Sequence, residues 1–250
     1  MGRRPRIVSH RGNTCGPFQA TENTVSAFAE ALGLPGVGGI EFDVDLTSDR
    51  LLVVHHRGKN EPPVVRTSYA RLRENNRGKQ IPLFEEVLNS LAGILAALGP
   101  GVQVLLDVEI KRDPETGFEE YGPEYAGAVL GLLERHLSPS VYAVTSFDGS
   151  LLRQVRALNP GLALGILYEN NPILAASLVR DVEELRPGFL APNHALVAQG
   201  SAQRPLFENA GLPLFLWTVD NRDLDRFLAD PLPAALITDQ PGQALLKLTP

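Results

Sequence analysis

Carboxylates on an apolar, strand-like run are the first candidates for chemistry in this sequence. Within residues 39–44, Glu41 and Asp43 alternate with apolar neighbours, so both side chains lie on the same side of a strand. Two carboxylates that face a protein interior repel each other and lose hydration unless a cation compensates them. Oxygen ligands of this kind suit a hard divalent cation. A pair of solvated carboxylates on an edge strand is the alternative, and the apolar flanks favour the metal.

A second strand-like run, within residues 102–110, carries the same alternation. Glu109 and Lys111 share one face of it, and a lysine beside a carboxylate is unusual filling for a core. We expect Glu109 to join Glu41 and Asp43 as a metal ligand, and Lys111 to neutralise a phosphate group. A structural ion pair between Glu109 and Lys111 is the alternative.

Histidines follow two further strand-like runs. His10 and Arg11 come directly after residues 7–9, where the histidine suits acid–base chemistry and the arginine suits phosphate binding. An ordinary loop is the alternative for this pair. His55 and His56 are adjacent, so their side chains point to opposite sides of an extended chain and at most one faces the site. Because the nearby candidate ligands are carboxylates, that histidine fits acid–base work better than metal ligation.

Other polar and aromatic residues stand at the ends of later strand-like runs. Trp217 is the only tryptophan and has the same strand parity as Phe215, so it can stack on a substrate or fill the core. His194 and Asp239 also stand at such ends and can line a pocket. These residues widen the predicted site without defining its chemistry.

Eight strand-like runs alternate with helical patterns along the chain. The runs cover residues 7–9, 39–44, 102–110, 141–144, 162–168, 188–190, 214–217 and 235–237. This alternation predicts a parallel sheet with crossover helices, and eight strands can close into a (β/α)₈ barrel. We therefore expect an α/β fold, a single TIM barrel domain over residues 1–250, with its site at the carboxyl ends of the strands. An open, doubly wound sheet is the alternative.

The first helical pattern shows how the sequence supports this site. Residues 25–32 carry apolar side chains at helical spacing, which predicts one buried face. Thr21 is expected to cap this helix, with Glu22 in its first turn. Farther along, the irregular polar stretch of residues 57–80 is expected to lie over one mouth of the barrel.

Composition argues against several classes of partner and site. The chain has 250 residues and a net charge of −6, which gives no support to a nucleic-acid partner or an anionic membrane. Cys15 is the only cysteine, so neither an internal disulfide nor a cysteine-based zinc site is expected. No run reaches the roughly 18 apolar residues of a membrane span, and the basic start lacks the roughly 7–15 of a signal peptide. We expect a soluble, cytoplasmic protein without stable membrane insertion. The sequence does not predict its oligomeric state.

Taken together, the motifs resemble those of the glycerophosphodiester phosphodiesterase family over nearly the whole chain. The matching segments include His10-Arg11-Gly12, Ala20-Thr21-Glu22-Asn23-Thr24, Glu41-Phe42-Asp43-Val44, Val53-Val54-His55-His56, Glu109-Ile110-Lys111, Trp217-Thr218-Val219 and Ile237-Thr238-Asp239. Each motif alone is weak, but their order and spacing together are specific. Two residues depart from the pattern: Arg57 stands where an aspartate follows the second histidine, and Arg50 stands where a turn glycine is usual.

The resemblance implies a (β/α)₈ barrel that hydrolyses small glycerophosphodiesters with the help of Mg²⁺ or Ca²⁺. It implies His10 and His56 as the acid–base pair, which leaves His55 outside the site. The implied cation ligands are Glu41, Asp43 and Glu109, the implied phosphate contacts are Arg11 and Lys111, and Trp217 is expected to contact the substrate. Arg57 near the mouth would favour a more anionic substrate. The alternatives are a lysophospholipase D-type phosphodiesterase on the same site and a non-catalytic barrel that binds phosphate ligands.

Overall fold

The computed structural model describes residues 4–16, 20–99, 101–112, 121–170 and 174–248. At the centre of this part of the chain is a ring of eight parallel strands: β1 (Arg6–His10), β2 (Gly39–Leu46), β4 (Leu105–Ile110), β5 (Tyr142–Ser146), β6 (Leu164–Tyr168), β7 (Phe189–Pro192), β8 (Leu214–Leu216) and β9 (Pro233–Thr238). Each strand pairs with its neighbour in this order, and β1 closes the ring by pairing with both β2 and β9. The predicted (β/α)₈ barrel is confirmed, and the alternative prediction of an open, doubly wound sheet is wrong.

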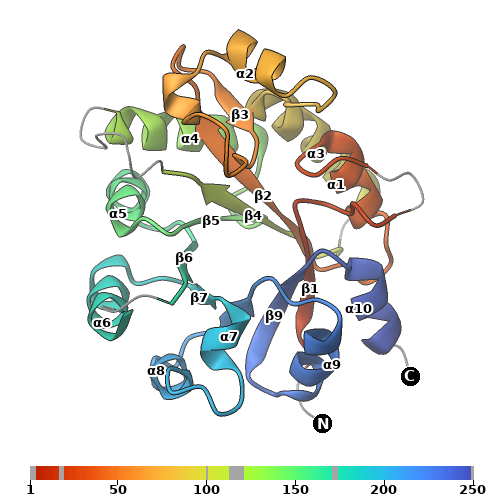
Figure 1. Cartoon of the computed structure of the whole chain (residues 1–250), viewed down its shortest axis with the longest axis vertical. Coiled ribbons are helices and arrows are strands. Elements are labelled where there is room, and N and C mark those ends of the chain that lie inside the picture. The colour runs from red at the N-terminus through yellow and green to blue at the C-terminus, as the bar shows by residue number, and fades with distance from the viewer. Residues whose placement is uncertain (1–3, 17–19, 100, 113–120, 171–173, 249–250) are drawn as a thin grey trace.

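Helices surround the ring of strands on its outside, as Figure 1 shows. They are α1 (Val25–Leu32), α3 (Phe84–Leu98), α4 (Gly122–His136), α5 (Gly149–Leu158), α6 (Leu174–Leu185), α8 (Arg204–Asn209), α9 (Arg222–Ala229) and α10 (Pro241–Leu248), with a short α7 (His194–Val197) after β7. Within the described ranges, no helix combines the length and the apolar character that crossing a membrane requires.

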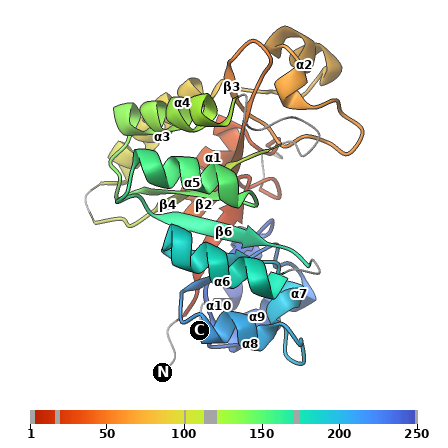
Figure 2. The same cartoon turned by 90° about the vertical axis from the view of Figure 1, so that its left-hand side faces the viewer.

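A segment of short secondary-structure elements follows the end of β2. The strand β3 (Leu52–Val54) runs antiparallel to β2, and the short helices η1 (Val64–Arg66) and α2 (Tyr69–Asn75) follow it. In Figure 2 the arrowhead of β6 points toward the side on which α2 lies. This segment therefore stands on the side of the carboxyl ends of the strands.

Alternation along β2 separates the core of the protein from its site. Phe42 and Val44 are fully buried on the outer face, where Phe42 packs against Phe28 of α1 and Phe84 of α3, with ring centroids 5.3 and 6.2 Å apart. The carboxylates of the same strand consequently take the opposite, inner face. The strand parity that the sequence predicted for these residues is confirmed.

Apolar side chains fill the barrel interior beneath the site. Gly165 of β6 leaves room for the ring of Phe189, which would lie 2.3 Å from a Cβ atom added to the glycine. Phe189 in turn stacks on Phe215 with centroids 4.1 Å apart, and Ala143 and Ala191 complete this cluster. The interior is thus a packed core, as in other barrels of this size, so small molecules bind at the mouth.

Three local expectations were wrong, one of them that Glu22 lies in the first turn of α1, which begins after Glu22 and holds no acidic residue there. The strand β4 begins at Leu105 and not at residue 102, and the backbone N–H of Leu105 donates to Gly38 O at 2.9 Å. The cap of α1 is Thr24, whose hydroxyl oxygen accepts from the backbone N–H of Ala27 at 3.3 Å. Thr21 lies one turn earlier, where its carbonyl oxygen accepts from the Thr24 hydroxyl at 2.6 Å.

A buried ion pair links α8 to the chain after α9. Arg204 donates to both oxygens of Asp230, at 2.6 and 3.1 Å, and the Asp230 side chain is only 3% exposed. These hydrogen bonds hold the pKa of Asp230 below its ordinary value. Asp230→Asn is expected to lower the free energy of unfolding at pH 7 by about 3 kcal/mol, because the guanidinium loses its buried charge partner and keeps only the more exposed Glu208.

The pH dependence of this stabilisation follows from the direction of the shift. Because the pKa of Asp230 is lower in the folded state, the stabilisation is present above the unfolded carboxyl pKa of about 3.9 and is lost as the pH falls through the folded value. Urea unfolding at neutral and acidic pH measures it. Asp225→Asn, which removes the exposed partner of Lys247, is the matched control and should change stability by less than about 1 kcal/mol. Equal losses for both variants at pH 7 would contradict the prediction.

Candidate active site

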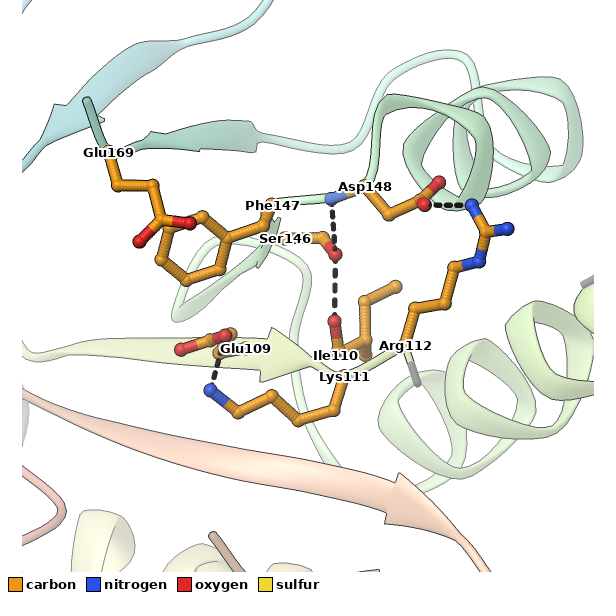
Figure 3. A pocket seen from close by; sticks show the side chains of 8 residues that line it. All are labelled: Glu109, Ile110, Lys111, Arg112, Ser146, Phe147, Asp148 and Glu169. Carbon is orange, nitrogen blue, oxygen red and sulfur yellow. Dashed lines mark hydrogen bonds and ion pairs between the residues drawn. The ribbon is translucent and has the colours of Figure 1, made fainter. Parts of the chain in front are cut away.

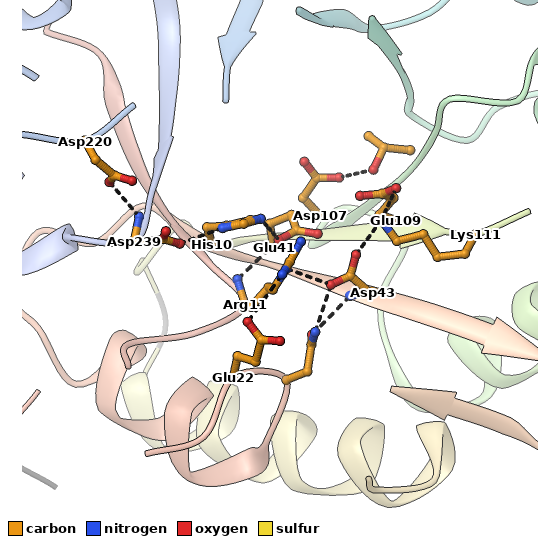
Figure 4. A network of polar contacts seen from close by, with 12 residues as sticks. His10, Arg11, Glu22, Glu41, Asp43, Asp107, Glu109, Lys111, Asp220 and Asp239 are labelled. Atoms are coloured by element: carbon orange, nitrogen blue, oxygen red, sulfur yellow. Dashed lines mark hydrogen bonds and ion pairs between the residues drawn. The ribbon is translucent and has the colours of Figure 1, made fainter. Parts of the chain in front are cut away.

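Two neighbouring strands, β2 and β4, bring the predicted carboxylates together at one mouth of the barrel, and β1 adds His10 beside them. In the ladder between β2 and β4, Glu41 is opposite Asp107 and Asp43 is opposite Glu109, while His10 of β1 is opposite Glu41. Ligand oxygens of Glu41, Asp43 and Glu109 all lie within 4.8 Å of one another, as the convergence in Figure 4 illustrates. Three buried carboxylates arranged in this way could hold one metal ion.

The electrostatics of this carboxylate cluster fit a cation. Burial raises the pKa of Glu41 well above its ordinary value, and the charges of Asp43 and Glu109 raise it further. Burial also raises the pKa of Glu109. The Oε1 atom of Glu41 is buried and makes no hydrogen bond with the described residues. A hard cation would relieve the repulsion and give this oxygen a partner, so the three residues fit Mg²⁺ or Ca²⁺.

Two cationic side chains border the cluster. Arg11 Nε lies 3.0 Å from Asp43 Oδ2, and Lys111 Nζ lies 2.6 Å from Asp43 Oδ1 and 2.5 Å from Glu109 Oε1. Burial opposes the ionisation of Asp43, but Lys111 and Arg11 outweigh it and hold the pKa of this carboxyl well below its usual range. Burial also disfavours the charge of Lys111, but Asp43 and Glu109 outweigh it and raise the pKa of this amine. Lys111 therefore stays charged at neutral pH.

The turn after β1 positions Arg11 through its backbone. Arg11 and Gly12 have positive φ angles of 53° and 84°, and a Cβ atom on Gly12 would lie 2.7 Å from the backbone of Ala27 in α1. Glycine is therefore required at this second position. The turn directs the backbone N–H of Arg11 to Glu41 Oε2, at 3.2 Å. A left-handed arginine of this kind is backbone strain of the sort kept at functional sites.

Asn23 holds Asp43 in place, a role that the sequence did not reveal. The side-chain amide of Asn23 donates to Asp43 Oδ2 at 2.8 Å, and its oxygen accepts from the backbone N–H of Asp43 at 3.2 Å. Asn23 also has a positive φ of 59°, which asparagine tolerates better than most residues. The only signal in the sequence was its place within a longer motif.

His10 contacts a carboxylate through each of its ring nitrogens. Its Nε2 lies 3.8 Å from Glu41 Oε2, and its Nδ1 lies 2.6 Å from Asp239 Oδ1. The backbone N–H of Asp239 and the hydroxyl of Thr238 both donate to Asp220 Oδ1, at 3.0 and 2.7 Å. These contacts fix Asp239 against the His10 ring, and Figure 4 draws His10, Asp239 and Asp220. The sequence placed Asp239 only among the possible pocket-lining residues, because no local pattern links it to His10.

The adjacent histidines point to different places. His56 lines the same hollow as His10, and burial lowers the pKa of His56 to about 4. His55 is buried away from this hollow, and its Nε2 lies 2.8 Å from Glu61 Oε2 in the following loop. His55 therefore fastens a loop, and His56 is the histidine that meets the site.

A hollow of about 220 Å³, here called the site hollow, opens over the carboxylates. Seven of the eight predicted site residues line it: His10, Arg11, Glu41, His56, Glu109, Lys111 and Trp217. Asp43 is fully buried and is held by the residues that surround it. Trp217 is fixed by a hydrogen bond from its Nε1–H to Ala191 O at 2.7 Å, which leaves part of the ring facing the hollow.

Comparison with known proteins agrees with this geometry. The model of the glycerophosphoryl diester phosphodiesterase family matches residues 10–243. The glycerophosphodiester phosphodiesterase of Caldanaerobacter subterraneus subsp. tengcongensis is 26% identical over 270 residues, which cover 97% of this chain and 96% of that protein.

Solved structures of similar proteins share the fold. A glycerophosphodiester phosphodiesterase from Parabacteroides distasonis has a TM-score of 0.78 at 19% identity, over 99% of this chain and 98% of its own. An Oleispira antarctica phosphodiesterase, solved in complex with the product sn-glycerol-3-phosphate, has a TM-score of 0.77 at 20% identity, over 99% and 98%. Because the family model spans nearly the whole chain, this protein belongs to the glycerophosphoryl diester phosphodiesterase family and is a phosphodiesterase.

Proposed function

We propose that this phosphodiesterase hydrolyses glycerophosphodiesters to an alcohol and glycerol 3-phosphate, with the help of a divalent cation and two histidines. The observation that carries the proposal is the convergence of three buried carboxylates, two cationic side chains and two histidines at one hollow. The Oleispira antarctica phosphodiesterase of the same fold was solved with sn-glycerol-3-phosphate, which supports the same product here.

The substrate phosphate would lie against the charged wall of the site hollow. Glu41, Asp43 and Glu109 would hold Mg²⁺ or Ca²⁺, which supplies neutralisation of the phosphate charge when bound. Arg11 and Lys111 stand beside these carboxylates, so their side chains reach the same phosphate oxygens. The charged wall orients the diester so that one phosphate ester faces the histidines.

The two histidines move the protons of the reaction. In the first step, the 2-hydroxyl of the glycerol attacks phosphorus, a new P–O bond forms, and the P–O bond to the departing alcohol breaks. One of His10 and His56 takes the proton of the hydroxyl, and the other gives a proton to the alcohol oxygen. Water then opens the cyclic phosphate, and the proton transfers run in the opposite direction. Holding the hydroxyl beside phosphorus gives the rate advantage of an intramolecular reaction.

Lysophospholipids are the alternative substrate class for the same site. Such lipids need an apolar groove for an acyl chain. The site hollow is instead small, and seven of the twelve side chains in its described lining are charged or ionisable. We therefore keep diesters with small alcohols as the proposed substrates.

Replacing each histidine tests this proposal. His10→Ala and His56→Ala are each expected to lower kcat by about 10²-fold or more, the usual contribution of a positioned acid or base. His55→Ala is the matched control, because this neighbouring ring contacts Glu61 outside the hollow, and its kcat should stay within a few-fold of the parent value. Steady-state kinetics with a glycerophosphodiester and added Mg²⁺ or Ca²⁺ measure all three. A large loss of kcat in His55→Ala together with a nearly unchanged kcat in His56→Ala would overturn the assignment of His56 as the catalytic histidine.

A further inference from the structure

A strongly basic segment stands beside the mouth of the barrel. Residues 57–80, here called the basic segment, hold seven lysine and arginine residues but only two glutamates, a net charge of +5. The whole chain carries −6, so the remaining residues together carry −11. The net charge of the chain therefore averages two regions of opposite sign, and such asymmetry is typical of proteins that bind a polyanionic surface.

The cations of the basic segment lie at its surface, and its carboxylates largely do not. Six of the seven cationic residues are exposed: Lys59, Arg66, Arg71, Arg73, Arg77 and Lys79. The Glu61 side chain is only 19% exposed, because its Oε2 atom contacts the His55 ring at 2.8 Å and the Asn76 amide at 3.4 Å. Glu74 is thus the one exposed carboxylate of the segment.

Three of the exposed cations make no ion pair with any residue that the structure describes. Arg71 and Arg77 share Glu74, with N–O distances of 2.7 and 3.2 Å. Within the same described ranges, no carboxylate pairs with three others: Lys59, Arg73 and Lys79. Uncompensated cations of this kind extend a positive potential beyond the surface of the protein.

The cations at the mouth itself are compensated by neighbouring carboxylates. Figure 3 shows Lys111 against Glu109 and Arg112 against Asp148, and both contacts are ion pairs. These charges belong to the surroundings of the site. No step of the proposed reaction uses the exposed cations of the basic segment, so they are free for a different role.

A small apolar core of its own makes the basic segment a folded platform. Val64 of η1 and Leu72 of α2 are buried in one cluster with Val53 of β3 and Ile81. Tyr69 packs against this cluster, and its hydroxyl donates to Ile81 O at 2.9 Å. The exposed cations are therefore presented by a packed unit attached to the barrel.

A lipid surface suits this platform better than a nucleic acid does. Proteins that bind single-stranded nucleic acids offer aromatic rings for base stacking, but Tyr69 is the only aromatic residue of the segment and is partly buried. In both Figure 1 and Figure 2, α2 lies at the outer edge of the molecule. A flat surface can contact such an edge without meeting the acidic remainder of the protein. Clusters of four to eight lysine and arginine residues are typical of proteins that bind anionic lipids.

We propose that the basic segment docks this protein on anionic phospholipid surfaces, through the charges of the lipid headgroups and without insertion into the bilayer. The segment stands on the side of the carboxyl ends of the strands, so docking brings the mouth of the barrel close to the lipid surface. The exposed cations lie outside the site hollow, so this binding does not depend on the proposed function.

Sedimentation with phospholipid vesicles tests this inference. At low ionic strength, vesicles of phosphatidylglycerol and phosphatidylcholine should bind the parent protein, and vesicles of phosphatidylcholine alone should not. In about 1 M salt, where the screening length falls to about 3 Å, the binding should be lost. Each cation near an anionic surface contributes about fivefold to the partition coefficient. A variant with three substitutions should therefore bind about 100-fold more weakly: Lys59→Gln, Arg73→Gln and Lys79→Gln.

The matched control replaces three exposed arginines outside the basic segment: Arg186→Gln, Arg222→Gln and Arg226→Gln. Both variants have the same net charge, and the control should keep the parent partition coefficient to within a few-fold. The thermal unfolding midpoint of each variant shows that it is folded.

Equal losses of binding in the two variants would overturn the inference, as would the absence of binding to anionic vesicles or equal binding to phosphatidylcholine vesicles. Binding of an RNA oligonucleotide without binding of anionic vesicles would also overturn it and would indicate a nucleic-acid partner. Because vesicle binding is measured without substrate, its failure leaves the proposed function standing. A protein that docks but turns over no glycerophosphodiester would contradict the proposed function alone.

Discussion

A glycerophosphodiester that lacks its 2-hydroxyl is expected to bind this protein and to react about 10⁵-fold more slowly than the parent substrate, or slower still. The analogue keeps the phosphate, so its contacts with the charged wall at Arg11 and Lys111 remain. It loses the attacking group, whose proximity to phosphorus contributes about 7–11 kcal/mol to an intramolecular reaction. Water would have to attack from a position that the hollow does not define.

Kinetics distinguish this loss of a nucleophile from a loss of binding. The analogue should inhibit with a constant near the KM of the parent substrate, because ground-state contacts are kept while kcat collapses. With the parent substrate, a 1,2-cyclic phosphate should appear early in a phosphorus NMR time course and then decay. Comparable turnover of the deoxy analogue would show that water attacks directly, and the roles of His10 and His56 would then need to be reassigned.

Removing divalent cations is expected to abolish turnover, and adding Mg²⁺ or Ca²⁺ is expected to restore it. Glu41, Asp43 and Glu109 are buried within 4.8 Å of one another, and burial raises the pKa of Glu41 and Glu109 because it removes hydration from their charged forms. A hard cation is the compensation that such oxygen ligands suit. Rate measurements after treatment with a chelator, followed by titration of each metal, check this expectation.

A binding measurement separates the metal site from catalysis. Cation binding to the folded state should raise the thermal unfolding midpoint of the parent protein with the logarithm of metal concentration once the site is largely filled, because only the folded state assembles the three ligands. Glu41→Gln removes one ligand charge and should weaken this shift. The midpoint of each protein without added metal is the reference from which its own shift is measured. Full turnover by metal-free protein would contradict the metal assignment.

The inner face of the barrel could be read from the sequence because strand geometry is periodic. A strand buried on both faces needs apolar residues throughout, so Glu41 and Asp43 among buried neighbours stood out as a site. The same parity argument allowed only one of His55 and His56 to face the site, and the family resemblance pointed to His56. The ladder between β2 and β4 then places Asp43 opposite Glu109, which follows from both strands ending at one mouth.

Side-chain contacts between residues far apart in the chain could not be predicted from the sequence. Asp239 lies 229 positions from His10, and only closure of the ring through the pairing of β1 with β9 brings them together. Pairing of both Arg11 and Lys111 with Asp43 likewise depends on side-chain conformations that strand parity does not define. The cap of α1 was misplaced because threonine residues occur at both candidate positions, and propensity alone does not choose between them.

Phosphorus NMR of a glycerophosphodiester in ¹⁸O-enriched water tests the central claim most directly. With the parent protein and Mg²⁺ or Ca²⁺, we expect one phosphate product, glycerol 3-phosphate, bearing ¹⁸O on phosphorus, and an equal amount of free alcohol without label. The variant with both His10 and His56 replaced by alanine should give no product in the same time. Formation of glycerol and a phosphorylated alcohol, or equal rates in the variant, would contradict the account.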